Sequence, residues 1–189
     1  MKVVAINGSP HKSGNTYTML KKVIDTCKKY EVETEILQVG GTNIHGCRAC
    51  GQCANKMQCF FNDDVFNEIY KKVITADAII LGTPSYFSDM SPEMKCFIDR
   101  TGFVSLNNGK LLKGKIGAGV VAQRRGGGSH VQASLNHVFL MCEAIIPGST
   151  YWNFGIGHSD TEVENDKEAM DNMVNLGENI MWLLNKIKK

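Results

Sequence analysis

The sequence predicts an α/β protein with three layers, in which a five-stranded parallel sheet lies between two layers of helices. Two observations lead to this fold class. Short apolar, β-branched runs alternate with helical patterns along the chain, and several of these runs are apolar at every position. Strands of that kind are buried on both faces, and parallel strands need crossover helices that cover those faces. No repeat or linker divides residues 1–189, so we expect a single domain.

The first elements carry clear start and stop signals. The run Lys2–Ile6 is short and apolar, and a polar Asn-Gly-Ser-Pro sequence ends it, which predicts a buried strand followed by a loop. A helix is expected from about Asn15 to Lys29, because apolar residues recur there at intervals of three and four. Glu33–Val39 is the second predicted strand, and Val65–Ile74 is the second helix.

The second half of the chain repeats the alternation. Ala76–Gly82 is continuously apolar and is therefore expected to be a central strand. The remaining predicted elements are a helix at about Pro92–Arg100, a strand at Ile116–Ala122, a helix at Ser129–Glu143, a strand near Ile145–Trp152 and a long amphipathic helix at Glu162–Lys186. Five strands thus alternate with five helices, as a doubly wound sheet requires.

Composition and charge exclude several classes of protein. The chain is 43% hydrophobic and 21% charged, which is typical of an ordinary globular protein. Apolar stretches such as Ala78–Leu81 are far shorter than the ~20 residues that cross a bilayer, and the N-terminus turns polar too early for a secretory signal. The net charge is only +2 and the lysines are dispersed. We therefore expect a cytoplasmic protein that acts on neither membrane nor nucleic acid.

The loop after the first predicted strand, Gly8–Thr16, is a candidate phosphate site. Ligands of doubly wound sheets bind beyond the carboxyl ends of the strands, and the unpaired amides at a helix N-terminus favour an anion. Ser9, Ser13, Asn15 and Thr16 offer further donors. The spacing fits neither a Walker loop nor a Gly-x-Gly-x-x-Gly fingerprint. The alternative is a purely structural helix cap made by Ser13 or Asn15.

Four of the seven cysteines lie within thirteen residues, at Cys47, Cys50, Cys53 and Cys59. This crowding and the odd total do not fit a disulfide framework, and they indicate metal or redox chemistry in a reducing compartment. Thiolates select iron–sulfur clusters or zinc. Structural zinc usually needs a gap of a dozen or more residues between two Cys-x-x-Cys pairs, and that gap is missing here. Three cysteines at this spacing are typical of a [4Fe–4S] ferredoxin. The sequence departs from the ferredoxin pattern in that Phe60, and not proline, follows Cys59. A [4Fe–4S] cluster, zinc and no metal all stay open.

Three segments resemble a known family. The Gly-Ser-Pro-x-x-x-Gly-Asn-Thr sequence of Gly8–Thr16 is similar to the phosphate loop of the flavodoxin-like NADPH-dependent FMN reductases, and Gly82–Arg100 resembles the stretch of that family that packs against the flavin ring. Ala122–Ser129 matches less specifically. The compact cysteine spacing resembles the iron–sulfur flavoprotein branch of the same family. The resemblance implies a flavodoxin-like fold, bound FMN and one [4Fe–4S] cluster on the four cysteines.

The resemblance also implies which residues surround FMN. They are Ser9, His11, Ser13, Gly14, Asn15 and Thr16 at the phosphate, Pro84, Ser85, Tyr86, Phe87 and Ser88 beside the ring, and Ala122, Arg124, Gly126 and Gly127 near its pyrimidine side. Tyr86 and Phe87 have the alternative of being core aromatics, and His11 and Arg124 that of facing solvent. No catalytic side chain is expected, because the flavin carries the chemistry.

The function expected from these features is that of an FMN-dependent oxidoreductase that passes electrons between FMN and a [4Fe–4S] cluster. Ferredoxin or NAD(P)H is the expected donor, and NAD(P)H is then a substrate. A homodimer or homotetramer is expected, because a small domain covers a flat ring poorly, and Trp152 and Trp182 are assigned to the core or to subunit contacts. The alternatives are a cluster-free NAD(P)H-dependent FMN or quinone reductase, a non-catalytic flavodoxin-type electron carrier and a zinc-stabilised binding protein.

Overall fold

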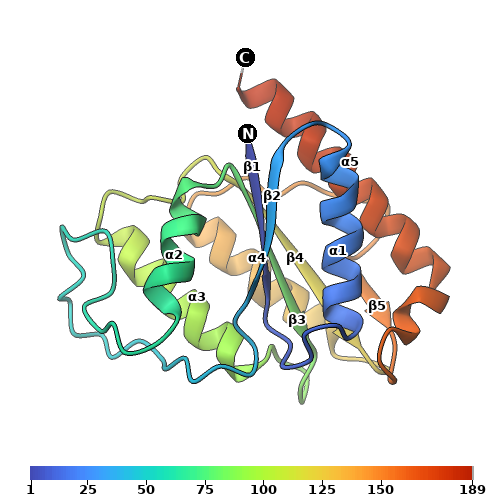
Figure 1. Ribbon diagram of the computed structural model, residues 1–189, viewed down its shortest axis with the longest axis horizontal. Coiled ribbons are helices and arrows are strands. Elements are labelled where there is room, and N and C mark those ends of the chain that lie inside the picture. The colour runs from blue at the N-terminus through green and yellow to red at the C-terminus, as the bar shows by residue number, and fades with distance from the viewer. Residues whose placement is uncertain (189) are drawn as a thin grey trace.

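The computed structural model describes residues 1–188, and in it a parallel sheet separates two layers of helices (Figure 1). The elements in chain order are β1 (Lys2–Asn7), α1 (Asn15–Lys28), β2 (Glu33–Gln38), α2 (Phe66–Thr75), β3 (Ala78–Pro84), α3 (Pro92–Leu106), β4 (Ile116–Gln123), α4 (Gly128–Met141), β5 (Phe154–Ile156), the 3-10 helix η1 (Glu162–Asn165) and α5 (Lys167–Ile187). This alternation confirms the predicted α/β class.

The order of the strands brings the loops of interest together. The five strands run in the order β2-β1-β3-β4-β5, and every pair is parallel. This is the strand order of flavodoxin-like sheets. Asn7 at the end of β1 pairs with Gly82, and Pro84 at the end of β3 pairs with Ala122. The loops that follow β1, β3 and β4 therefore leave the sheet at one edge.

Burial explains why the central strands are apolar throughout. All eight residues of β4 are buried, as are the first six of β3. Helices α1 and α5 supply the core on one face of the sheet, and α2, α3 and α4 supply it on the other. Glycines in β4 let α4 approach closely, because a Cβ on Gly117 would lie 2.2 Å from the ring of Phe139.

Three predicted boundaries were wrong, and each has a local reason. The last strand is not at Ile145–Trp152 but at Phe154–Ile156, because Pro147 has no amide to donate and interrupts the earlier segment after a single bridge between Ile116 and Ile145. Helix α3 continues six residues past Arg100, since Val104 and its neighbours extend the buried face. Helix α5 begins at Lys167, where the Asp166 carboxylate caps the amide of Ala169.

None of the helices within residues 1–188 combines the length and the apolar character needed to cross a bilayer.

Candidate functional site

A cavity of about 220 Å³ opens at the carboxyl edge of the sheet. Four loops, which follow β1, β3, β4 and β5, form its walls. The lining residues are Ser9, His11, Gly14, Asn15, Thr16, Pro84, Ser85, Tyr86, Ala122, Gln123, Arg124, Gly157, His158 and Asp160. Ten of the fifteen FMN residues expected from the sequence are in this set, so segments more than a hundred residues apart in the chain meet at one place.

The loop after β1 is held in place by side-chain amides. The Asn7 amide nitrogen donates to Gln38 Oε1 at 2.7 Å, the Gln38 amide nitrogen donates to the carbonyl of Ser9 at 2.7 Å, and the Ser9 amide donates back to Asn7 Oδ1 at 3.1 Å. The buried end of the loop therefore has little freedom. Its backbone is fixed before any ligand arrives, which lowers the entropic cost of binding.

The start of α1 leaves donors unused. Gly14 is the N-cap residue and no side chain caps the helix, which excludes the structural cap by Ser13 or Asn15. Within residues 1–188 the amides of Asn15 and Thr16 donate to no protein acceptor. Thr16 is only 1% exposed, yet its hydroxyl also has no hydrogen-bond partner among the described residues. Free amides, a buried hydroxyl and the positive end of a helix dipole together favour an anion such as a phosphate.

The other side chains of this loop have different positions. The Asn15 amide nitrogen donates to the carbonyl of Ser159 at 2.9 Å, and Asn15 Oδ1 accepts from the amide of Val163 at 3.0 Å. Asn15 therefore braces the loop after β5, and its side chain is not a free phosphate donor. Ser13 is exposed and does not line the cavity. His11 Nδ1 lies 3.5 Å from the carboxylate of Asp160, and both side chains are largely exposed.

The loop after β3 forms a tight hairpin at the opposite wall. Tyr86 and Asp89 bond to each other through their backbones, and Phe87 and Ser88 between them have φ values of +50° and +64°. Two consecutive positive φ angles are typical of a type I′ turn. Tyr86 lines the cavity, whereas Phe87 projects from the tip of the hairpin and is fully exposed. Neither aromatic ring belongs to the core, which excludes that alternative.

The loops after β3 and β4 touch each other. The Ser85 amide donates to the carbonyl of Ala122 at 2.8 Å. Gly127 has a φ of +89°, and a Cβ there would lie 2.7 Å from Ser85 Oγ, so only glycine fits. Gly126 and Gly127 take part in this loop contact and do not line the cavity. Arg124 does line it. The site thus has a phosphate-binding end, an aromatic wall and one guanidinium, which fits a phosphorylated aromatic ligand.

The four clustered cysteines line a second concavity. Cys47, Cys50, Cys53 and Cys59 all face it, together with residues of α3 and with Phe60 and Phe61. All of them are free thiols. Burial raises the pKa of the Cys53 thiol, and the neighbouring sulfurs of the cluster add to the effect. The four side chains therefore converge on one place, as a shared metal group requires.

The cysteine sulfurs are less closely gathered in this structure than the ligands of a tetrahedral zinc ion. Tetrahedral zinc with Zn–S bonds of about 2.3 Å holds its sulfurs roughly 3.8 Å apart. Among residues 1–188 no three of the cysteine sulfurs lie within 4.8 Å of one another, whereas His45, Asp63 and Asp64 do meet that criterion. A [4Fe–4S] cluster spreads its ligands more widely, because each thiolate binds a different iron. The buried Arg100 lines the same concavity, and its Nε has no acceptor among the described residues. A free donor beside four thiols fits an anionic metal–thiolate group, whether zinc or a cluster.

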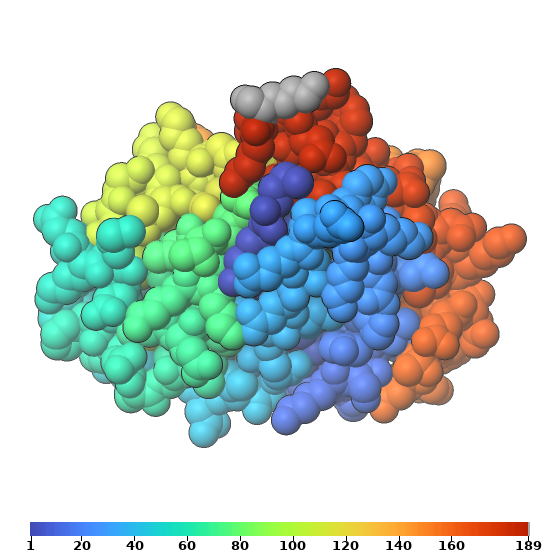
Figure 2. Space-filling view, turned by 45° about the horizontal axis from the view of Figure 1, so that its top comes forward, coloured from blue at the N-terminus to red at the C-terminus, as the bar shows by residue number. Residues whose placement is uncertain are grey.

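The two sites are built from different segments of the chain. The cysteine loop extends beyond α2 and α3 at the left of the molecule, while β5 and the loop that follows it lie at the right (Figure 1, Figure 2). The two concavities share no lining residue. The cysteine loop follows β2, and Cys53 packs against the end of α3 through Phe103 and Asn108.

Comparison with known proteins identifies the family. Residues 1–159 match the model of a family described as NADPH-dependent FMN reductase. The chain is 32% identical to an iron-sulfur flavoprotein of Methanocaldococcus jannaschii, with all of both chains covered. It is 33% identical to an iron-sulfur flavoprotein of Archaeoglobus fulgidus over 81% of this chain and 75% of that one. The chain belongs to the NADPH-dependent FMN reductase family.

Solved structures confirm the flavodoxin-like fold of this FMN reductase family member. A WrbA-like flavodoxin from Agrobacterium tumefaciens superposes with a TM-score of 0.69 at 14% identity, over 98% of both chains. RosB, solved with a bound derivative of riboflavin phosphate, superposes with a TM-score of 0.78 at 15% identity, over 100% of this chain and 80% of its own. At such identities the likeness concerns the fold alone.

Sequence reasoning missed one wall of the FMN reductase cavity. Gln123, Gly157, His158 and Asp160 line it but were not expected there. Three of them follow β5, whose position was predicted several residues too early. The signal that could have found them is the Phe-Gly-Ile sequence of 154–156 followed by Gly157 and a polar stretch, which has the same strand-then-loop pattern as the start of the chain.

Asn15→Ala tests the brace between α1 and the loop after β5. The variant loses two hydrogen bonds, with an expected cost of about 1–3 kcal/mol in total, so exchange of the Val163 amide should accelerate about tenfold or more while the amides of β4 stay protected. Hydrogen exchange followed by NMR or mass spectrometry measures this. His11→Ala is the control, because it changes a cavity residue that makes no bond to Val163. Equal protection of Val163 in both variants would contradict the assigned role of Asn15.

Proposed function

We propose that this chain is an FMN-dependent oxidoreductase that passes electrons between FMN and a [4Fe–4S] cluster held by Cys47, Cys50, Cys53 and Cys59. One observation carries the proposal: a cavity built for a phosphorylated aromatic ligand and a separate concavity lined by four free thiols occur in one chain. When bound, FMN exchanges electrons in pairs or singly and the cluster exchanges them singly, so together they connect the two kinds of carrier.

The residues of the cavity would bind FMN as follows. The amides of Asn15 and Thr16 and the Thr16 hydroxyl would hold the phosphate, since they are free donors at a helix N-terminus. Tyr86 would contact the ring from the β3 side, and Arg124 would place positive charge at the β4 side, where reduction of a flavin builds negative charge. No side chain of this chain is assigned a proton-transfer role.

For the donor we propose NAD(P)H or ferredoxin. The family description names NADPH, and a relative named NAD(P)H dehydrogenase (quinone) from Trichlorobacter lovleyi is 36% identical over 43% of this chain and 40% of its own. A nicotinamide donor delivers hydride to the flavin, whereas ferredoxin delivers single electrons and suits the cluster. The proposal places this chemistry in the cytoplasm, where free thiols persist.

We further propose that the chain forms a homodimer or homotetramer and that a second copy covers the face formed by α4 and residues 145–156. Between Gly126 and Gly157, Glu143 is the single Asp, Glu, Lys or Arg. Exposed apolar side chains nevertheless gather there: Leu140, Met141, Tyr151 and Trp152 are all more than half exposed. Depletion of charge together with exposed aromatic residues and Met is typical of an interface core. A face without charge can also meet its own copy without repulsion.

Assembly also bears on the electron path. The cysteine concavity and the candidate FMN cavity share no lining residue, and Cys53 packs against α3 and the residues that follow it. We therefore propose that electrons pass between the cluster of one subunit and the FMN of another. A monomer would then lose the exchange between the two cofactors.

Thr16→Val tests the FMN assignment. The change keeps the shape of the side chain and removes a hydroxyl whose hydrogen bond to a charged group is worth about 1.5–3 kcal/mol, so the Kd for FMN should rise at least tenfold. Quenching of FMN fluorescence on binding measures the Kd. Thr18→Val is the matched control, since Thr18 lies one half-turn along α1 and does not line the cavity. The same FMN affinity in both variants would count against this site.

Cys50→Ala tests the cluster. After anaerobic reconstitution with iron and sulfide, the native chain should hold about four irons and the variant should hold none, because the open coordination site exposes the cluster to loss. Electron transfer from ferredoxin should fail, while hydride uptake by FMN from NAD(P)H should remain. Cys96→Ala, which removes a thiol outside the concavity, is the control. Fewer than about three irons in the native chain would favour the cluster-free reductase, and one zinc per chain would favour a structural site.

Trp152→Glu tests the subunit face. A buried, unpaired charge in an interface core is expensive, so the variant should dissociate to monomers at micromolar concentration, as measured by light scattering after size exclusion. Trp182→Glu is a closely matched control, because both tryptophans are 61% exposed but Trp182 lies on α5, at the other face of the sheet. A native protein that is already monomeric, or equal dissociation in both variants, would refute the assignment of this face.

A further inference from the structure

Arg100 is a charged side chain in the core of the protein. It lies on α3 and is only 1% exposed, and it is among the largest fully buried side chains of the described chain. Its partner in a buried ion pair is Asp64, whose side chain is 3% exposed. A buried ion pair is rarely a gain in stability over well-packed apolar residues. Its presence between α3 and the segment after the cysteines therefore points to a role other than stability.

The guanidinium contacts both ends of the cysteine loop. On the N-terminal side of Cys47, Nη1 of Arg100 donates to the carbonyl of His45 at 3.4 Å. On the C-terminal side of Cys59, Nη1 pairs with Asp64 and Nη2 donates to the carbonyl of Phe61 at 3.1 Å. The planar group also stacks on the ring of Phe66, with 4.2 Å between Cζ and the ring centroid. One side chain thus joins the two segments between which all four cysteines lie.

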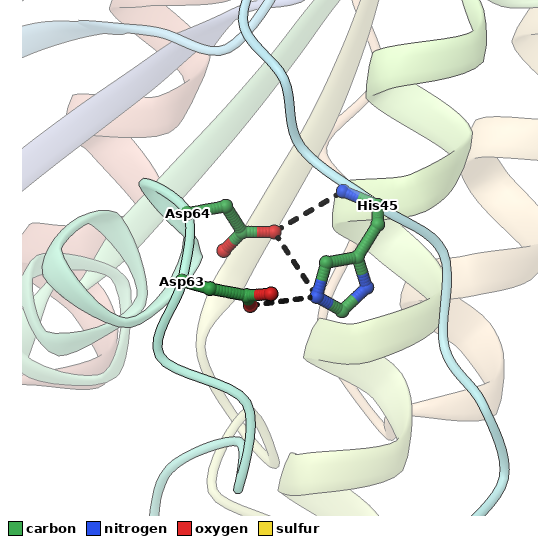
Figure 3. A group of neighbouring side chains, drawn as sticks. All are labelled: His45, Asp63 and Asp64. Atoms are coloured by element: carbon green, nitrogen blue, oxygen red, sulfur yellow. Dashed lines mark hydrogen bonds and ion pairs between the residues drawn. The ribbon is translucent and has the colours of Figure 1, made fainter.

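Asp64 completes this closure from the other direction. Its carboxylate accepts from the amide of His45 at 3.1 Å and from the amide of Phe66 at 3.0 Å. The His45 ring lies against the same group, with Nε2 at 3.1 Å from Asp63 and 3.6 Å from Asp64 (Figure 3). Burial opposes ionisation of Asp64, but the two amides and the guanidinium outweigh it and hold the pKa of this carboxyl below its ordinary value.

The loop between these ends has little regular structure of its own. Within residues 47–59 the backbone makes only two turn bonds, Ala54 to Gly51 and Lys56 to Cys53. Asn108 holds the middle of the loop, through the carbonyl of Cys53 at 2.9 Å and the amide of Met57 at 3.0 Å. Closing a loop at its base reduces the conformations left to it. Arg100 and Asp64 supply that closure, and Asn108 adds a second point of attachment.

We propose that Arg100 is a positioning residue which, with Asp64, closes the base of the cysteine loop and holds the four thiols facing one concavity before a metal group binds. Arg100 also lines this concavity, and its Nε–H has no acceptor among residues 1–188. That free donor suits a sulfur atom of the anionic group bound there. The inference rests on the proposed function for the identity of that group, but the closure of the loop is a property of the protein alone.

The first test uses the full chain with all thiols reduced and no metal added. The double variant Arg100→Met/Asp64→Asn removes the ion pair without leaving an unpaired buried charge, and Asn keeps an acceptor for the amide of Phe66. Alkylation of Cys53 by iodoacetamide should accelerate at least tenfold, and trypsin should cleave faster after Arg48 and Lys56, both of which are exposed loop residues. Lys95→Met is the matched control, because it breaks the exposed pair of Lys95 with Asp99 on the same helix.

Cys27 gives an internal control for global unfolding. It is fully buried in the other core layer, between α1 and α5, so its alkylation rate should not change. If Cys27 also becomes reactive in the double variant, Arg100→Lys replaces it as the test. Lysine keeps the charge near Asp64 but cannot bond both loop ends with a planar fork. In Arg100→Lys we expect faster labelling of Cys53 and unchanged labelling of Cys27. Unchanged labelling of Cys53 in the variant that stays folded would overturn the proposal.

The second test separates this inference from the proposed function. In anaerobic reconstitution the native chain should take up iron at least three times faster than Arg100→Lys, and the Lys95→Met control should match the native chain. If the native chain takes up no iron, the cluster is wrong, and the labelling result still decides whether Arg100 closes the loop. If the native chain takes up iron and Arg100→Lys does so at the same rate, Arg100 does not position the thiols and the proposal fails.

Discussion

The structure depends on the burial of its central strands on both faces. Helices α1 and α5 cover β3 and β4 on one side, and α2, α3 and α4 cover them on the other. The middle of these strands therefore exposes no side chain that could bind a ligand. Polar chemistry is therefore confined to the edge where the strands end. Asn7 pairs with Gly82, and Pro84 pairs with Ala122, so the carboxyl ends of β1, β3 and β4 lie side by side. The cavity forms between the loops that follow these ends.

The two candidate sites are built by different means. The candidate FMN cavity uses backbone: free amides at the start of α1, and glycines where the loops after β3 and β4 touch. The side-chain amides of Asn7 and Gln38 hold the loop after β1. The cysteine concavity uses side chains on a loop with little backbone structure, and it needs an outside element, α3, to give it shape. The first site is rigid because of the sheet, and the second is rigid because a buried ion pair closes its base.

Separation of the two sites connects local structure with assembly. Electron exchange between the two groups proposed for these sites would be assisted by a second subunit that brings one site against the other. The face of α4 and residues 145–156, with its single charged residue and exposed aromatic side chains, offers a surface for such a contact. Charge is sparse on the face where a copy is proposed to dock, whereas a charged pair is buried at Arg100 and Asp64, where the cysteine loop is proposed to be held.

The sequence by itself determined the class of fold, the loop between β1 and α1 that lines the cavity, and the group of four cysteines, because these depend on patterns that are local: apolar runs, a helix start and close spacing. It also indicated the family through two of those motifs. Tertiary structure alone decided what Asn15 bonds to, where β5 lies and what closes the cysteine loop. Asn15 meets Val163 across 148 positions of the chain, and Arg100 meets Asp64 across 36. Partners so distant leave no periodic signal, since only the packed helices and strands bring them within hydrogen-bonding distance.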